Sequence, residues 1–164
     1  VNASGSSVGS VLQTWDVSAD YSTTSNPAPT ISGGIWSYGY LSYGVGGQPD
    51  ATSFTLYQEN GDVVGRPVQA WQDVAAPTVD TMGAGSYNDT STLQTHCQIN
   101  WNPTEVDLVP DQGGSVVSTV RFQVPTSGAY SVLAEFADNQ GAGGREGDAW
   151  VLTDSSASAL DGIW

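Results

Sequence analysis

The stretch from Ser115 to Asp138 constrains the fold more than any other part of the chain. Its first half is apolar at alternate positions from Val116 to Val124, with Ser118 as the exception, and its second half repeats the alternation from Tyr130 to Phe136. A period of two is typical of strands that bury one face. The intervening Pro125-Thr126-Ser127-Gly128 is typical of a turn. The stretch therefore predicts a β-hairpin in an antiparallel all-β protein.

The rest of the chain shows no sustained helical spacing, and Gly, Pro or Asn-Gly interrupts it about every ten residues, as in sandwiches. Asn60-Gly61 predicts a tight hairpin turn. We expect a flexible N-terminal arm at residues 1–12 and a single β-sandwich domain at 13–164. The main strands outside the hairpin are predicted at residues 11–21, 35–43, 63–71, 93–101, 105–109 and 149–153.

Charge narrows the possible partners. The 164 residues include 17 acids, three arginines and no lysine, for a formal net charge of −14. Such a charge opposes binding to nucleic acid and to anionic lipid. No apolar run approaches the roughly 20 residues of a membrane-spanning helix. We therefore predict no nucleic-acid partner and no membrane insertion.

Export is predicted from the polar composition, the absence of lysine and the strand-rich pattern. The polar start Val1-Asn2-Ala3-Ser4 fits a mature chain whose leader has been removed, at the cell surface or outside the cell. The single cysteine, Cys97, allows no intrachain disulfide. Asn2-Ala3-Ser4 and Asn88-Asp89-Thr90 fit the acceptor pattern for N-glycosylation.

Several motifs together resemble a known family. They are Tyr21–Pro27, Gly34–Tyr40 with its Trp-Ser-Tyr-Gly, Phe54-Thr55-Leu56, Val106–Pro110, and the Pro-x-x-Gly-x-Tyr of Pro125–Tyr130. The chain from about Asp20 to Thr153 resembles the jelly-roll domain of secreted bacterial surface proteins, a sandwich similar to carbohydrate-binding modules. The resemblance implies an antiparallel jelly-roll-like β-sandwich without catalytic activity.

Domains of this family usually continue past the strand at Val151-Leu152 with a hairpin and closing strands, whereas this sequence ends at Trp164. An incomplete sandwich exposes a strand edge, which is a template for another chain. Either earlier segments of the chain close the sheet differently, or a strand from a partner chain completes it. The N-terminal arm is the candidate donor for strand exchange, with Val8, Val11 and Leu12 available to insert.

Six aromatic residues are candidates for carbohydrate binding. Trp36, Tyr38 and Tyr40 are spaced by two and share one strand face. Tyr43, Trp71 and Trp101 lie near predicted strand ends. Exposed rings could stack on the apolar faces of sugars, whereas buried rings would form the core. The sequence leaves both interpretations open.

Other site chemistry is sparse. Asp138, Asn139, Glu146 and Asp148 surround a glycine-rich loop and form a weak candidate site for Ca²⁺; an ordinary solvated turn is the alternative. No other cofactor is expected. The chain has one histidine, His96, and no Gly-x-Ser-x-Gly motif, so we predict no enzymatic activity.

Two functional hypotheses follow. The first is a structural subunit of an extracellular filament, surface layer or matrix, whose partners are copies of itself or other surface proteins. The second is a monomeric glycan-binding module that recognises polysaccharide through exposed aromatic side chains. The predicted strand exchange favours the first, and the aromatic face favours the second.

Overall fold

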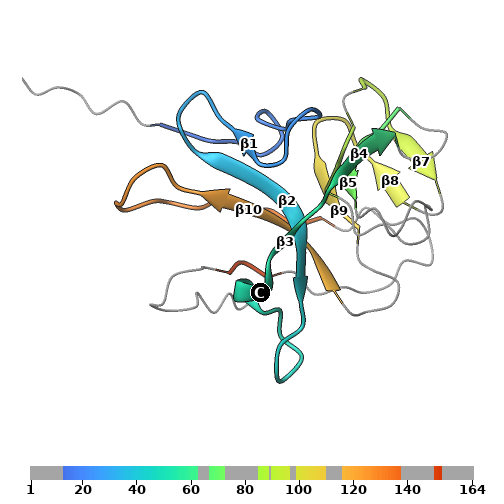
Figure 1. Cartoon of the computed structure of the whole chain (residues 1–164). Helices are drawn as coiled ribbons and strands as arrows, with labels where there is room; N and C mark the ends of the chain where they lie inside the picture. The colour runs from blue at the N-terminus through green and yellow to red at the C-terminus, as the bar shows by residue number, and fades with distance from the viewer. Residues whose placement is uncertain are drawn as a thin grey trace, which may run out of the picture.

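The protein is an all-β chain with antiparallel sheets, which confirms the predicted class (Figure 1). The computed structural model describes residues 13–62, 67–72, 85–88, 90–96, 99–109, 116–137 and 150–152. In these ranges the helical content is a single 3₁₀ turn, η1 (Ala51–Ser53). No helix among them is long and apolar enough to cross a bilayer.

The two longest strands pair with each other in the first sheet, with β2 in its centre. β2 (Ile35–Ser42) pairs along its whole length with β10 (Val116–Gln123), from Ile35 opposite Gln123 to Ser42 opposite Val116. The other edge of β2 pairs with two short strands, β1 (Ala28–Pro29) and β3 (Thr55–Leu56). Both long strands lie where the alternating pattern predicts them.

Shorter strands make up the remaining sheets. The second sheet has the order β4-β5-β6-β9, formed by β4 (Glu59–Asp62), β5 (Gln69–Gln72), β6 (Gly85–Tyr87) and β9 (Val106–Leu108). The third is the hairpin of β7 (Gln94–His96) and β8 (Ile99–Trp101). The predicted single strand at residues 93–101 is thus two short strands.

Two apolar clusters form the described core, and β5 contributes to both. Trp71 packs with Tyr38 and Tyr57 in the larger cluster, on the core face of β2. Its neighbour Ala70 packs with Trp101 and Val68 in the smaller one. Because successive side chains of a strand point to opposite faces, β5 is buried on both sides and connects the two clusters.

The Asn26 side chain joins β2 to the residues after β3. Its Nδ2 donates to the carbonyl oxygens of Tyr38 (2.7 Å) and Tyr57 (2.9 Å), and its Oδ1 accepts from the Tyr38 amide (2.9 Å). The amide side chain therefore satisfies backbone groups that a further strand would otherwise pair. This role explains the asparagine of the Asn-Pro motif.

The structure corrects two of the predicted local elements. The described part of the expected first strand, residues 13–21, contains no strand; instead Asp16 Oδ1 accepts from the amides of Ser18 and Ala19 and closes a turn. The predicted hairpin turn at Asn60-Gly61 is also wrong, because both residues lie inside β4, opposite Trp71 and Ala70. Pairing with the buried strand β5 outweighs the local turn preference of Asn-Gly.

Two further strand predictions are wrong at the C-terminal side. Residues 124–137, which include the expected return strand of the hairpin, belong to no strand. Residues 150–152 of the predicted strand at 149–153 also form none. Strand-like alternation needs a partner to form a ladder, and no described segment pairs with either stretch.

The Gly39→Ala variant is expected to lose about 1–3 kcal/mol of stability or more, because the residues that lead into β3 lie directly against this glycine. A Cβ at Gly39 would overlap the backbone carbonyl oxygen of Thr55 and lie 2.8 Å from Phe54 Cζ. Thermal unfolding followed by circular dichroism measures the loss. Gly61→Ala is the matched control, since a Cβ there meets only Gln72 Nε2 at 3.8 Å. Equal melting temperatures for the two variants would contradict this packing.

Candidate functional site

The aromatic face of β2 belongs mainly to the core. Tyr38 is fully buried, and its ring centroid lies 4.8 Å from that of Tyr21. Trp36 and Tyr40 are half-buried and pack against other rings, Trp36 at 4.5 Å from Phe122. The spacing by two correctly places the three rings on one face, and that face is largely covered.

The candidates near strand ends divide between core and surface. Trp101 is fully buried, and Trp71 is 6% exposed, with its indole nitrogen donating to the Ser22 carbonyl oxygen at 2.7 Å. Tyr43 is 39% exposed, beside the loop that follows β2. Of the six candidates for carbohydrate binding, Tyr43 alone is exposed. Tyr38, Trp71 and Trp101 offer no ring face to a ligand in this conformation.

Among the described residues, the groups whose pKa values are shifted do not titrate near neutral pH, where general acid–base catalysis operates. Burial raises the pKa of Tyr38 to about 12 and also raises that of Tyr21. Hydrogen bonds from Ser18 lower the pKa of Asp16, and those from Thr52 lower the pKa of Asp50. Both tyrosines therefore stay neutral and both aspartates stay ionised at pH 7.

The calcium candidates Asp138, Asn139, Glu146 and Asp148 lie outside the described residues, as do the strand-exchange candidates Val8, Val11 and Leu12. Both sites therefore stay predictions. Across the ranges that are described, no three His, Cys, Asp or Glu side chains gather as metal ligands would.

Asn88 fits the glycosylation pattern in the sequence, but in the structure its side chain has a structural role. Its side chain is fully buried, with Nδ2 donating to the carbonyl oxygens of Thr92 (3.0 Å) and Trp101 (2.7 Å). Its Oδ1 accepts from the amide and the hydroxyl of Thr90, at 3.0 and 2.6 Å. The Asn-x-Thr spacing is also that of an Asx turn, in which the side chain binds the residue two positions on. The side-chain nitrogen that would carry a glycan is thus buried and already donates two hydrogen bonds.

The surface feature that most resembles an interaction site follows β10. Here we define the return segment as Tyr130–Glu135. Val132 is 73% exposed and Leu133 is 96% exposed, while Val124 and Tyr130 are 42% and 39% exposed. Figure 1 shows this orange chain extending beyond the end of β10 before it turns back. The alternation that predicts a strand here thus marks an apolar surface instead.

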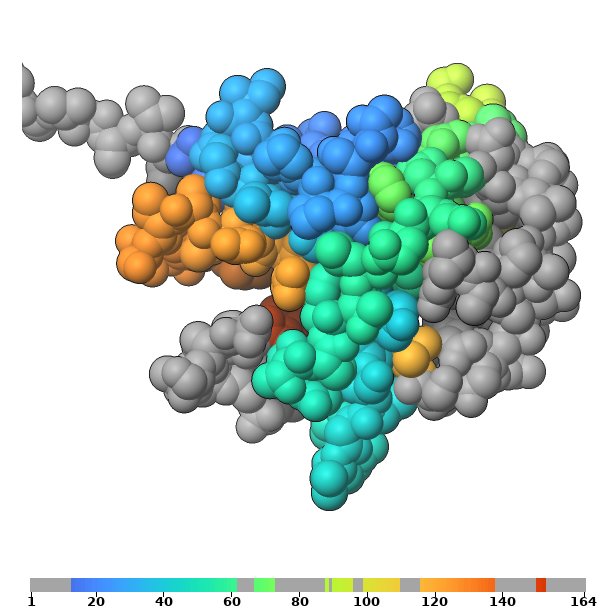
Figure 2. Space-filling view, viewed as in Figure 1, coloured from blue at the N-terminus to red at the C-terminus, as the bar shows by residue number. Residues whose placement is uncertain are grey.

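The same orange chain borders a hollow in the molecular surface. Figure 2 shows the hollow below it, with the red residues 150–152 visible at the back. Trp150 in this short stretch donates from its indole nitrogen to Gln48 Oε1 at 3.1 Å, and Leu152 is 38% exposed. The exposed Val132 and Leu133 therefore belong to the chain segment beside this hollow.

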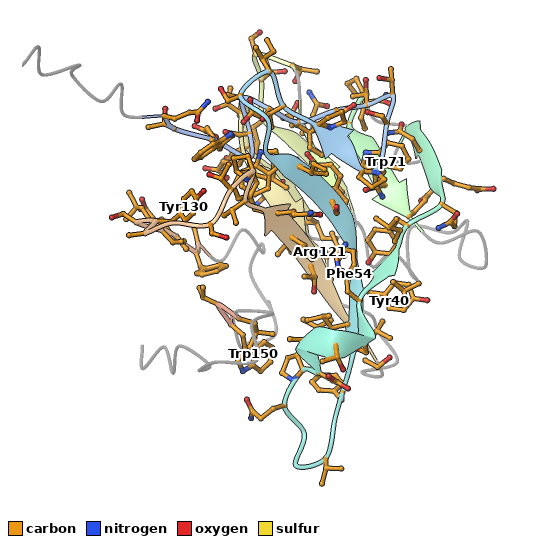
Figure 3. All side chains as sticks on the ribbon, turned by 60° about the vertical axis from the view of Figure 1, so that its left-hand side comes forward. Tyr40, Phe54, Trp71, Arg121, Tyr130 and Trp150 are labelled. Atoms are coloured by element: carbon orange, nitrogen blue, oxygen red, sulfur yellow. The ribbon has the colours of Figure 1, made fainter. Side chains whose placement is uncertain are left out.

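The positively charged side chain of Arg121 lies on the face of β10 that points away from the core. The guanidinium carbon of Arg121 is 4.0 Å from the ring centroid of Phe54, where β10 and the start of β3 flank β2 (Figure 3). Arg121 is the one lysine or arginine in the part of the chain that the structure describes. It therefore places a positive charge on β10 in a protein of net charge −14.

Comparison with known proteins adds no relative. No family model matches the chain, and neither the curated proteins nor the solved structures contain a match. The resemblance to secreted jelly-roll domains therefore depends on the motifs in the sequence.

Proposed function

We propose that this chain is a non-enzymatic extracellular protein that serves as a structural subunit of a filament, surface layer or matrix. In this proposal its sheets form a jelly-roll-like sandwich that a strand from a neighbouring chain completes. The observation that carries the proposal is the exposed apolar return segment, which follows β10 after the turn at residues 125–128.

The exposed side chains in this segment are large and close together. Val132 and Leu133 are adjacent, and Val124 lies just before the turn. Fully burying a Val or Leu side chain contributes about 1.5–3 kcal/mol, so a partner that covers them gains substantially. Contiguous apolar patches on soluble proteins often mark interaction sites, and strand-like segments at sheet edges favour pairing with another chain.

The charge of the chain sets conditions for assembly. At −14 per chain, copies repel one another at low ionic strength. Salt shortens the range of this repulsion to about 8 Å at physiological ionic strength. Assembly should therefore strengthen between low and physiological salt, because apolar contact drives it and charge opposes it.

The glycan-binding alternative has weaker support. The exposed ring of Tyr43 and the half-buried rings of Trp36 and Tyr40 are the observations in its favour. Sugar-binding platforms use exposed ring faces, and three of the six candidates are core residues. Quenching of tryptophan fluorescence by soluble polysaccharide in a monomeric protein, lost in Tyr43→Ala, would favour this alternative.

Light scattering after size-exclusion chromatography, with electron microscopy of the same fractions, tests the structural proposal. We expect species larger than the 17.0 kDa chain at micromolar concentration, growing with protein and salt concentration. A single species of 17.0 kDa with a cooperative melt under all these conditions would rule out self-assembly.

A matched pair of variants locates the contact. Val132→Lys places a charge in the return segment, and Val45→Lys places the same charge on a fully exposed valine in the loop after β2. Both variants change the net charge equally, so a difference between them reports position. We expect only Val132→Lys to reduce assembly, with both proteins melting like the parent.

A further inference from the structure

The edge of β10 that faces away from β2 is the candidate site at which another strand would pair. One edge of β10 pairs with β2 over all eight residues, Val116–Gln123. No strand among the described residues pairs with its other edge. An edge strand of this length, unpaired by the described segments, presents a row of backbone donors and acceptors for another extended segment.

Contacts at the end of β10 define the face on which a partner strand would bury its apolar side chains. Phe122 on the core face packs 5.2 Å from Trp15, measured between ring centroids. Tyr130 lies 6.1 Å from the same Trp15 ring, and its hydroxyl donates to the Thr126 carbonyl oxygen at 2.6 Å. Tyr130 and Phe122 therefore both pack on Trp15, so Tyr130 falls on the core face when the segment that follows extends as a strand.

An antiparallel register follows from this shared face. Placing Tyr130 opposite Val124 puts Val132 opposite Phe122 and leaves the small Ala134 opposite Val120. All the apolar alternate residues of the segment then extend the core face of β10, where Val120 already packs against the larger cluster. A shift by one residue would turn these side chains to the opposite face.

The same register gives complementary charge on the other face. It places Leu133 opposite Arg121 and Glu135 opposite Thr119. Glu135 is then the diagonal neighbour of Arg121, within reach of a long side chain. The apolar Leu133 side chain, which is exposed in the single chain, would then lie beside the Arg121–Phe54 pair and be partly covered by it.

We infer that the partner of β10 is the return segment, Tyr130–Glu135, of a second copy of this chain, paired antiparallel with Val124 opposite Tyr130. The inference names the contact behind the proposed assembly and rests on that proposed function. The segment does not form a ladder with its own β10 in the structure. Exchange between copies uses the contacts that a closed hairpin would make within one chain, which is the usual route to swapped dimers.

Disulfide trapping tests the partner and the register together. Gln123 and Ser131 are both exposed and lie opposite each other in the inferred register. Chains carrying Gln123→Cys are mixed with isotope-labelled chains carrying Ser131→Cys and oxidised gently. Peptide mass spectrometry then identifies the linked residues and separates them from any product of the native Cys97. We expect a labelled–unlabelled dimer joined through positions 123 and 131.

Glu135→Cys in place of Ser131→Cys is the off-register control. Position 135 lies four residues, or about 13 Å, further along the strand, beyond the reach of a disulfide. We expect the 123–131 link to exceed the 123–135 link by about tenfold or more. Equal yields would overturn the register.

The Gln123→Cys/Ser131→Cys double variant distinguishes a failure of the inferred strand exchange from a failure of the proposed structural role. A disulfide within one chain, in protein that still assembles by light scattering, would overturn the exchange while the structural role stands. A protein that stays monomeric at every concentration would overturn both. An interchain 123–131 link in the assembled protein supports both.

Discussion

The Trp101→Ala variant is expected to lose about 3–5 kcal/mol of unfolding free energy. The indole is fully buried in the smaller core cluster, against Val68 and Ala70. Alanine leaves a cavity among these side chains that the surrounding short strands can only partly fill. In addition, the Trp101 carbonyl oxygen accepts from Asn88, so a shift of β8 would disturb that hydrogen bond as well.

Urea unfolding followed by far-ultraviolet circular dichroism measures this loss, since tryptophan fluorescence would change with the substitution itself. Tyr43→Ala is the control, because Tyr43 is 39% exposed and its loss should change stability by less than about 1 kcal/mol. A Trp101→Ala protein as stable as Tyr43→Ala would show that Trp101 is not a core residue.

The second large effect is expected for Asn88→Ala, at about 3 kcal/mol. The substitution removes both donors and the acceptor of a fully buried amide. It leaves the carbonyl oxygen of Trp101 without its 2.7 Å donor and the amide of Thr90 without its acceptor. Buried polar groups that lose their partners carry the full cost of desolvation, which makes this more damaging than loss of a surface hydrogen bond.

Thermal unfolding of Asn88→Ala beside Gln58→Ala tests this assignment. Gln58 is an exposed amide residue whose Nε2 donates to the Leu56 carbonyl oxygen, so its truncation removes a hydrogen bond without burying unpaired groups. We expect a much larger fall in melting temperature for Asn88→Ala. A folded protein carrying a glycan on Asn88, with unchanged stability, would refute the structural role of this side chain.

Long alternating runs were sufficient to predict β2 and β10, because each carries eight residues of consistent pattern and the two lie together in register. The pattern also placed Trp36, Tyr38 and Tyr40 on one face. It could not say whether that face was covered, since the covering residues Tyr57 and Trp71 come from later segments. The jelly-roll sandwich remains a prediction from the motifs.

Signals confined to two or three residues were less reliable. Asn60-Gly61 is typical of a turn, yet it pairs with β5 inside a strand. Asn88-Asp89-Thr90 fits a modification site, yet the fold buries its asparagine. In both cases a partner distant in the sequence supplies interactions that outweigh the local preference.

Alternation along the chain establishes which side chains share a face, because that depends only on the geometry of an extended backbone. It cannot establish which edges are paired or which faces meet water. Val132 and Val120 have the same place in the pattern, yet Val120 packs against the core and Val132 is 73% exposed. The difference arises because β10 has β2 beside it, whereas the return segment has no such strand among the described residues.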